Sequence, residues 1–289
     1  MKILVIGNGF LGSAIIRRLE ADGHELLIYS RSTKEGTRGK QIRGDIFAFD
    51  EFLKVFTWKP EVIVHTAWVT AHGSYVDDPS NYDYAKFTTE LARHVATTDV
   101  SHLIVLGSCA EYGHRSEAST AGFTKLNPNT LYAQQKVASF ISVGEALRNS
   151  GIRMTWARVF QPYGPEQDKH RLVPYILETL RQGGDVRIRD TSTILDWITT
   201  RDIASAVSFI IRENTDAEVD IGTSIGFKNV ELLRHLEEMV GNTKQWEKFT
   251  EQSSSNGDVS LVGKKSPLLR LGWLPGDSLS VGLEWAIRT

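Results

Sequence analysis

The chain begins with a short apolar run that leads into a glycine-rich turn and then into a segment with helical spacing. Residues 3–6 are all apolar, as expected of a strand buried on both faces of a parallel sheet. They enter a G-x-G-x-x-G pattern formed by Gly7, Gly9 and Gly12, and residues 13–20 continue with the apolar spacing of a helix. Strand, glycine turn and helix in this order predict the first unit of a doubly wound parallel α/β sheet.

The three glycines also suit a dinucleotide cofactor. Gly7 is placed to make the tight turn, Gly9 lets the backbone approach a pyrophosphate, and Gly12 lets the helix pack on the strand. The helix N-terminus would face the phosphates with free N–H groups and the positive end of its dipole. A glycine-rich turn in an unrelated α/β protein is the alternative, and the flanking strand and helix favour dinucleotide binding over it.

The end of the second predicted strand, residues 25–30, bears on which dinucleotide is bound. An acidic residue there would hold the ribose 2′-hydroxyl of NAD, but this chain has Ser30 followed by Arg31, with Lys34 close by. No carboxylate would repel a 2′-phosphate, and a guanidinium can stack on adenine or form paired hydrogen bonds with the phosphate. We therefore expect NADP(H) to be preferred over NAD(H). The alternative is that Arg31 and Lys34 belong to an ordinary solvated loop.

Strands and helices continue to alternate as far as residue 160, and the alternation loosens after a turn cluster at 161–165. The pattern predicts an α/β fold, a Rossmann doubly wound parallel sheet with a smaller C-terminal α/β substrate lobe. We place the dinucleotide-binding domain at 1–165 and the lobe at 166–289, with 201–223 returning to the Rossmann domain. The further strands are predicted before Gly44 and over 62–67, 103–107, 152–160 and 196–198, and the helices over 81–97, about 131–149, from 171, 202–211 and 228–240, with a final turn at 271–275.

Tyr132 and Lys136 are four residues apart on one predicted helix, so they project from the same face. A phenol titrates near pH ~10, and an adjacent ammonium favours its ionised form, which would let Tyr132 exchange a proton with a substrate oxygen near neutral pH. Ser108 ends the strand over 103–107, at the sheet edge where ligands of open α/β folds bind, and can donate a hydrogen bond to the same oxygen. The Y-x-x-x-K spacing is common by chance, and it gains meaning from the nucleotide fingerprint in the same chain.

Composition excludes several classes of partner. The chain has 33 Lys and Arg against 35 Asp and Glu and no basic block, so we expect no nucleic acid and no anionic membrane as partner. No apolar run approaches the ~20 residues that cross a bilayer, and the N-terminal run is too short for a secretion signal. The one cysteine, Cys109, cannot form an intrachain disulfide, which fits a cytoplasmic protein. Residues 253–257 are expected to form a surface loop.

Taken together, these residues resemble the extended short-chain dehydrogenases/reductases, the nucleotide-sugar epimerase/dehydratase family. The resemblance spans nearly the whole chain, and its motifs are highly specific as a set. Two stretches, Gly-Ser-Cys-Ala-Glu-Tyr at 107–112 and His-Thr-Ala-Trp at 65–68, are most similar to reductases of nucleotide-linked 4-keto-6-deoxy sugars. The matching segments are the glycine fingerprint, Gly44-Asp45, 65–67, 108–113, Tyr132 with Lys136, Arg158 with 163–165, 221–223 and 271–273.

The resemblance implies an NADPH-dependent reduction of the keto group of a nucleoside-diphosphate sugar. Hydride would pass from NADPH to the keto carbon while Tyr132 protonates the oxygen, with Ser108 and Lys136 completing a catalytic triad. The dehydratases carry an acidic pair after the catalytic Ser or Thr, and Cys109-Ala110 stands there instead, so dehydration is not expected. A 4-epimerase with tightly bound NAD(P) and a non-catalytic NADP-sensing protein are the alternatives. The helices over 81–97 and 131–149 resemble the pair through which this family usually dimerises, so the resemblance implies a homodimer.

The resemblance also implies which residues bind each ligand, and no metal site is expected. Departures from the family pattern at Gln161, Leu195 and Tyr84 concern the nucleotide and its diphosphate, for which Arg171 and Arg201 are candidate contacts. The expected substrate-binding residues are His72, Cys109, Arg171 and Arg201. The expected cofactor-binding residues are Gly7, Gly9, Phe10, Leu11, Gly12, Ser30, Arg31, Lys34, Asp45 (opposite the adenine amino group), Ile46, Thr66, Ala67, Lys136 and Gln161.

Overall fold

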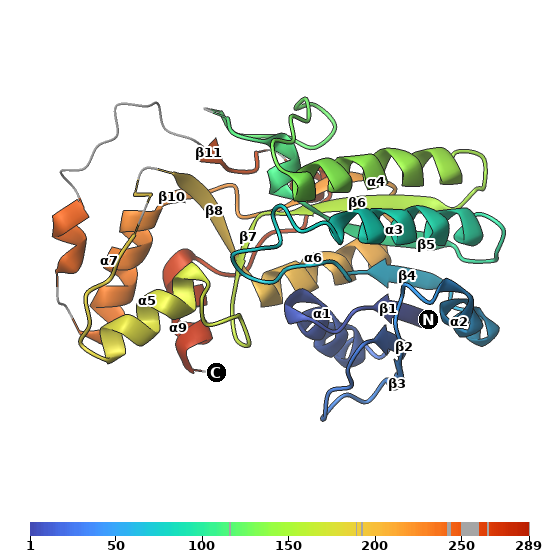
Figure 1. Ribbon diagram of the computed structural model, residues 1–289, viewed down its shortest axis with the longest axis horizontal. Coiled ribbons are helices and arrows are strands. Elements are labelled where there is room, and N and C mark those ends of the chain that lie inside the picture. Colours follow the sequence, from blue (N-terminus) through green and yellow to red (C-terminus); the bar gives the residue numbers. More distant parts are fainter. Residues whose placement is uncertain are drawn as a thin grey trace.

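The computed structural model describes residues 1–115, 117–188, 190–191, 193–241, 244–249, 260–264 and 266–288. A parallel sheet with helices on both faces forms the larger part of the molecule, and a smaller lobe stands at one end of it (Figure 1). The loop predicted over 253–257 lies outside the described residues. Within those ranges, no helix combines the length and the apolar character that a membrane span needs.

The large sheet has the strand order β3-β2-β1-β4-β5-β6-β9, and all its pairings are parallel. The chain moves outward in one direction from β1 through β2 to β3 and in the other direction from β4 onward. The crevice between the carboxyl ends of β1 and β4 is therefore the switch point at which such sheets bind ligands. The strands are β1 (Lys2–Ile6), β2 (Glu25–Ser30), β3 (Lys40–Arg43), β4 (Val62–His65), β5 (His102–Ser108), β6 (Arg153–Val159) and β9 (Ala217–Ile221).

Helices cover both faces of this sheet, and for this reason residues 3–6 of β1 have no exposed surface at all. One face is covered by α1 (Phe10–Ala21) and α6 (Thr200–Glu213), which pack on each other. The other is covered by α3 (Asn81–Val95) and α4 (Leu131–Leu147), with α2 (Phe49–Leu53) and η1 (Lys54–Trp58) at its edge (Figure 1). The short helix η2 (Cys109–Tyr112) follows β5 directly.

The smaller lobe is built around β8, which pairs with three short strands. Its apolar core contains Tyr163, Trp197 and Leu233 and is separate from the two cores of the large sheet. Its elements are β7 (Gln161–Tyr163), α5 (Leu172–Arg181), β8 (Ile194–Thr199), β10 (Gly226–Lys228), α7 (Asn229–Val240), η3 (Gln245–Phe249), β11 (Ser260–Leu261) and α9 (Leu279–Arg288), while α8 (Pro267–Arg270) packs beside β9 of the large sheet.

The fold class predicted from the sequence is confirmed, with differences at the ends of elements. β4 stops at His65 instead of continuing to Ala67, because the N–H groups of Thr66 and Ala67 both donate to the Ile6 carbonyl and turn the chain away. The chain does not finish in the turn at 271–275, since α9 follows it. Residues 200–221 belong to the large unit, because α6 packs on α1 and β9 pairs with β6.

Candidate active site

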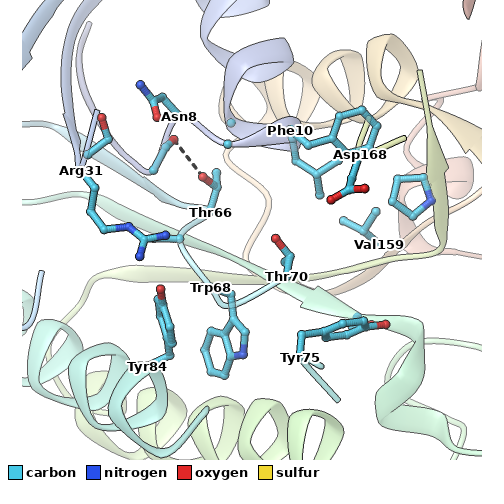
Figure 2. A pocket seen from close by; sticks show the side chains of 18 of the residues that line it. Asn8, Phe10, Arg31, Thr66, Trp68, Thr70, Tyr75, Tyr84, Val159 and Asp168 are labelled. Atoms are coloured by element: carbon cyan, nitrogen blue, oxygen red, sulfur yellow. Dashed lines mark hydrogen bonds between the residues drawn. The ribbon is translucent and has the colours of Figure 1, made fainter. Parts of the chain in front are cut away.

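A cleft of about 480 Å³ lies at the carboxyl ends of the strands. The glycine turn and the end of β2 line one part of it, and the end of β5, the start of α4 and residues 159–171 line the other. Figure 2 shows Arg31 extending across the cleft toward Tyr84 at one end, and Tyr75 and Asp168 at the other. The glycine turn and the Ser108–Tyr132 pair therefore line one continuous cleft.

The glycine turn has the shape that a pyrophosphate needs. Gly7 has φ +99°, and a Cβ there would lie 2.9 Å from the Ala67 nitrogen. A Cβ on Gly12 would overlap the Gly7 carbonyl oxygen, so both positions require glycine for packing. A Cβ on Gly9 would meet nothing within 4 Å, because Gly9 precedes α1 and faces open space. The residues present therefore fit a dinucleotide whose phosphates approach the N-terminus of α1 at Gly9.

The end of β2 places two cations differently. Arg31 is exposed and lines the cleft, and no acidic residue stands at positions 30–32. Lys34 also lines the cleft, but its Nζ donates to Ser13 Oγ at 2.7 Å and to Glu166 Oε2 at 2.6 Å. Glu166 accepts a further hydrogen bond of 2.7 Å from Arg17, and the hydrogen bonds from both cations lower the pKa of its carboxyl. The Glu166 carboxylate thus holds the Lys34 ammonium in place.

The residues after β3 also line the cleft. Asp45 lines the cleft, and its Oδ1 accepts a hydrogen bond of 3.0 Å from the Phe47 N–H. Ile46 is buried beside it, and the Tyr29 hydroxyl donates to the Asp45 carbonyl at 3.2 Å. These contacts order the turn that contains Asp45, the residue expected opposite the adenine.

Ser108 and Tyr132 come together in the cleft from β5 and α4. The N–H of Tyr132 donates to the Val76 carbonyl at 2.9 Å, and Thr130 caps α4 by accepting from the Ala133 N–H. Burial raises the pKa of the Tyr132 phenol, and a hydrogen bond with the Ser108 hydroxyl acts in the opposite direction. The phenol therefore keeps its proton at neutral pH, which is the form that a general acid requires.

Lys136 lies one layer beneath the cleft instead of lining it. Its side chain is 5% exposed, and its Nζ donates to the Leu106 carbonyl at 2.7 Å. The Nζ is 6.0 Å from the centre of the Tyr132 ring and 3.7 Å from that of Trp68. Burial lowers the pKa of Lys136 to about 7, and the Glu111 carboxylate opposes this shift. The four-residue spacing predicts an ammonium directly beside the phenol, whereas in the structure Ser108 is the group that lowers the phenol pKa.

A buried polar cluster supports Ser108 from behind. Glu111 is fully buried and accepts hydrogen bonds from the Ser108 N–H at 2.8 Å, from Trp156 Nε1 at 3.0 and 3.1 Å, and from Arg158 Nε at 2.7 Å. Because Glu111 is three residues after Ser108, the same contact closes the first turn of η2, and the Ser108 hydroxyl accepts a hydrogen bond of 3.2 Å from the Ala110 N–H in that turn.

The expected substrate-binding residues do not all reach the cleft. Arg171 lines it, donates to the Thr70 carbonyl at 2.9 Å and places its guanidinium 4.9 Å from the Tyr75 ring centre. Cys109 also lines it, and burial raises the pKa of its thiol to about 12, so the thiol is not a nucleophile at neutral pH.

The other two expected residues lie elsewhere. His72 stacks beside His170 with ring centres 6.2 Å apart and is outside the set of residues that line the cleft. Arg201 forms an ion pair with Asp277 and covers the ring of Trp285, and it too does not line the cleft.

Every expected cofactor-binding residue except Lys136 lines the cleft. Sequence reasoning missed several lining residues from the loop after β4 and the loop after β7, among them Thr70, Tyr75 and Asp168. Neither loop has a periodic pattern that would reveal its direction. Among the described residues, no group of three or more His, Cys, Asp or Glu side chains is arranged to hold a metal ion. The residues that line the cleft from the expected cofactor set are Gly7, Gly9, Phe10, Leu11, Gly12, Ser30, Arg31, Lys34, Asp45, Ile46, Thr66, Ala67 and Gln161.

Comparison with known proteins agrees with this geometry. Residues 3–222 match the model of the NAD-dependent epimerase/dehydratase family. The chain is 25% identical to UDP-glucose 4-epimerase of Lactobacillus helveticus over 99% of this chain and 97% of that protein. It is also 25% identical to GDP-L-fucose synthase of Sinorhizobium fredii, over 98% of this chain and 93% of that protein.

Two solved structures share the fold over the full length of the chain. UDP-glucose 4-epimerase of Thermotoga maritima, solved with UDP-glucose, has a TM-score of 0.85 at 21% identity and is covered over 98% of its chain. dTDP-glucose 4,6-dehydratase of Bacillus anthracis, solved with NAD, has a TM-score of 0.84 at 19% identity and is covered over 96% of its chain.

Proposed function

The chain belongs to the NAD-dependent epimerase/dehydratase family, and from this premise we propose that it is an NADPH-dependent reductase of a nucleotide-activated 4-keto-6-deoxy sugar. The observation that carries the proposal is the cleft itself. It joins a glycine cradle, a β2 end that carries Ser30 and Arg31 and no carboxylate, and a protonated Tyr132 whose phenol lies close to the Ser108 hydroxyl. These are a site for a phosphorylated dinucleotide and a site that can donate a proton to a carbonyl oxygen.

Tyr132, Ser108 and Lys136 each have a separate role in the proposed reaction. When bound, NADPH supplies the hydride that adds to the keto carbon. Tyr132 gives its proton to the keto oxygen, and Ser108 donates a hydrogen bond to the same oxygen as negative charge develops there, a contribution of about 3 kcal/mol. Lys136 lies beneath Tyr132 and offsets the charge left on its oxygen, and the Glu111 carboxylate favours the charged form of the lysine.

The preference for NADP(H) follows from the charges at the end of β2. Arg31 is exposed in the cleft and can pair with a 2′-phosphate through two parallel hydrogen bonds. Lys34 adds positive charge nearby, although it must exchange its contact with Glu166 for a contact with the phosphate. An NAD-specific site would place a carboxylate where Ser30 stands.

The nucleoside-diphosphate sugar is assigned to the end of the cleft that faces the smaller lobe. Arg171 is the cation that lines this end, and its half-buried guanidinium, over the Tyr75 ring, would exchange its hydrogen bond with the Thr70 carbonyl for one with the diphosphate. Arg201 has its guanidinium in the ion pair with Asp277, so we assign the diphosphate to Arg171. His72 lies beside His170 and does not line the cleft.

A homodimer is also part of the proposal. α3 and α4 lie side by side on one face of the sheet (Figure 1), and each carries a large apolar side chain that is more than half exposed, Tyr82 on α3 and Ile141 on α4. Covering such side chains with a second copy of the same helix pair would bury them in a closed, two-fold symmetric interface.

A 4-epimerase is the second candidate, favoured by the names of several relatives, such as the enzyme of Lactobacillus helveticus. An epimerase oxidises and re-reduces one carbon, so it retains its cofactor and consumes none. A non-catalytic NADP-sensing protein is the third candidate, and the presence of Ser108, Tyr132 and Lys136 argues against it.

One experiment separates these candidates. The purified protein is mixed with NADPH and a panel of 4-keto-6-deoxyhexoses linked to UDP, dTDP, GDP or CDP, and the absorbance of NADPH is followed. We expect oxidation with at least one sugar, and a loss of about a hundredfold or more in kcat for Tyr132→Phe with NADPH affinity retained. No oxidation across the panel at high enzyme contradicts the reductase, bound NAD(P) with interconversion of epimers supports the epimerase, and a Tyr132→Phe variant equal to wild type supports the sensor.

A further inference from the structure

The Lys136 ammonium is buried with few protein partners. Its side chain is 5% exposed, and one of its three N–H groups donates to the Leu106 carbonyl at 2.7 Å. On another side it faces an aromatic ring, because its Nζ lies 3.7 Å from the centre of the Trp68 ring. A cation this close to an indole face and shielded from water is attracted by the electron density of the ring.

The Trp68 ring is itself fixed in place. Its Nε1 donates a hydrogen bond of 2.8 Å to Asn81 Oδ1, and Asn81 is fully buried at the start of α3. The Asn81 amide nitrogen donates to the Tyr75 and Asp78 carbonyls at 2.7 and 2.8 Å, and Tyr84 stacks on Trp68 with ring centres 5.7 Å apart. Figure 2 shows the Trp68 ring between Tyr84 and Tyr75, all three of which line the cleft. The indole is therefore held by the first turn of α3 and cannot turn away at low cost.

The same contacts connect the indole to Tyr132. Tyr75 meets the Tyr132 ring edge to face at 5.0 Å, and Trp68 meets it at 6.4 Å in a similar arrangement. Lys136 lies one helical turn after Tyr132, so an indole that holds the lysine also fixes the distance between the two side chains. The ring thus links the charge on the lysine to the position of the phenol.

The charged and titratable groups around Lys136 do not exclude a contribution of the Trp68 ring to its charged form. The carboxylate of Glu111 on η2 raises the pKa of the ammonium, but it also forms an ion pair with Arg158. His65 of β4 is buried and neutral at neutral pH, since burial and the nearby Lys136 lower its pKa to about 3. Tyr132 on α4 is protonated at neutral pH. The Trp68 face and the Leu106 carbonyl are thus contacts that the ammonium makes directly, in addition to the attraction of the Glu111 carboxylate.

We propose that Trp68 is a positioning residue of the reaction, which holds the Lys136 ammonium in its charged form beneath Tyr132 through the face of its indole ring, and that Asn81 fixes the ring in this orientation. The catalytic part of this inference rests on the proposed ketoreductase. The contact between Trp68 and Lys136 is testable without any substrate.

The test replaces Trp68 site-specifically with monofluoro-, difluoro- and tetrafluorotryptophan, which keep the shape of the ring and progressively weaken the negative potential of its face. Lysine carrying carbon-13 at Cε is incorporated, and the Lys136 signal is identified as the one missing from Lys136→Arg. An NMR titration then gives the Lys136 pKa in each protein. The same fluorinated residues at Trp197, a buried indole in the core of the smaller lobe, form the matched control.

We expect the Lys136 pKa to fall stepwise along the fluorinated series at position 68, by about one unit or more at tetrafluorotryptophan, and to stay constant along the series at 197. Trp68→Phe, which keeps an aromatic face, should lie between wild type and Trp68→Leu. With an active enzyme, kcat at a pH above the Lys136 pKa should fall by about tenfold for each unit of pKa lost.

The two readouts separate the inference from the proposed function. A Lys136 pKa that is flat along the series at position 68 overturns the role of Trp68, even if the protein oxidises NADPH. A graded pKa in a protein that reduces no keto sugar supports the contact between Trp68 and Lys136 and removes only the ketoreductase. A graded pKa with an unchanged kcat overturns the positioning role in catalysis.

Discussion

Arg158 Nε donates a hydrogen bond of 2.7 Å to Glu111 Oε2, and neither side chain has any exposed surface. The other end of the guanidinium donates to Glu218 at 2.7 Å, where β6 and β9 run side by side. Because Glu111 also accepts from the Ser108 N–H, the end of β5 that carries Ser108 is bonded to this buried ion pair. The site and the stability of the sheet are therefore linked through one carboxylate.

Removing one partner of this pair should be costly. Arg158→Met leaves the Glu111 carboxylate buried without its counter-ion, and we expect the free energy of unfolding in urea to fall by about 3–5 kcal/mol. Arg148→Met is the matched control, because Arg148 pairs with Glu145 on the exposed end of α4, and it should cost under about 1 kcal/mol. Similar small losses for both variants would contradict the role assigned to the buried pair.

Asp220 should make the protein less stable as the pH rises. Its Oδ1 accepts from the Tyr112 hydroxyl at 2.7 Å, and burial raises its pKa from 3.8 to about 6. Since the folded-state pKa exceeds the unfolded value, this carboxyl stabilises the fold fully only below the unfolded pKa, and the contribution is lost as the pH rises through about 6. Asp220→Asn removes the titration.

The measurement for Asp220 is urea unfolding across this pH window. The free energy of unfolding of Asp220→Asn minus that of wild type should increase by about 2 kcal/mol between about pH 4.5 and pH 7.5. The loss of the acceptor for the Ala121 N–H lowers the difference equally at every pH. A difference that does not change with pH would show that the Asp220 carboxyl is not the buried acid described here.

Arg31 should decide between the two dinucleotides. Arg31→Ser removes the guanidinium that lies in the cleft, and we expect the Kd for NADPH to rise by about 10–100-fold while the Kd for NADH changes little. Fluorescence titration of both cofactors measures this. Arg38→Ser is the control on the same loop, since Arg38 binds the Glu20 carbonyl. Unchanged NADPH affinity in Arg31→Ser would place the 2′-phosphate elsewhere.

Glu166 should weaken NADPH binding in the wild type. Its carboxylate holds the Lys34 ammonium at 2.6 Å, so a 2′-phosphate must compete for that cation. In Glu166→Gln the competition is weaker, and the Kd for NADPH should fall by about 3–10-fold with the Kd for NADH unchanged. An equal change in both Kd values would indicate that Glu166 stabilises the local structure around Lys34 and does not compete with the 2′-phosphate.

The parts of the site that the sequence predicts are those encoded locally. The glycine turn, the end of β2 and Ser108 at the end of β5 each follow an apolar strand, and the strand direction brings them to one edge. The four-residue spacing of Tyr132 and Lys136 predicts a shared helix face. It does not predict the position of the lysine ammonium, which is buried against the Leu106 carbonyl and the Trp68 ring.

The parts that could not be predicted depend on contacts between distant segments. Glu111 and Arg158 meet because Gly107 pairs with Arg158 in the register of β5 and β6, and no local pattern specifies that register. The loop after β4 has no periodic pattern, so the positions of Trp68 and Tyr75 follow from the tertiary structure.

The sequence does carry a pattern that predicts α9, because the apolar residues Leu279 and Leu283, both buried in the structure, are four residues apart.

The most direct test of the central claim is the fate of the hydride. The protein is incubated with NADPH carrying deuterium at C4 of the nicotinamide, on either face in separate reactions, and with the 4-keto-6-deoxy sugar nucleotide that the panel identifies. We predict that one of the two labelled cofactors gives a product heavier by one deuterium at the carbinol carbon, with one NADPH consumed per product, and that Tyr132→Phe gives almost none. A sugar nucleotide that interconverts with its epimer without gaining deuterium, at constant NADPH, would contradict the reductase.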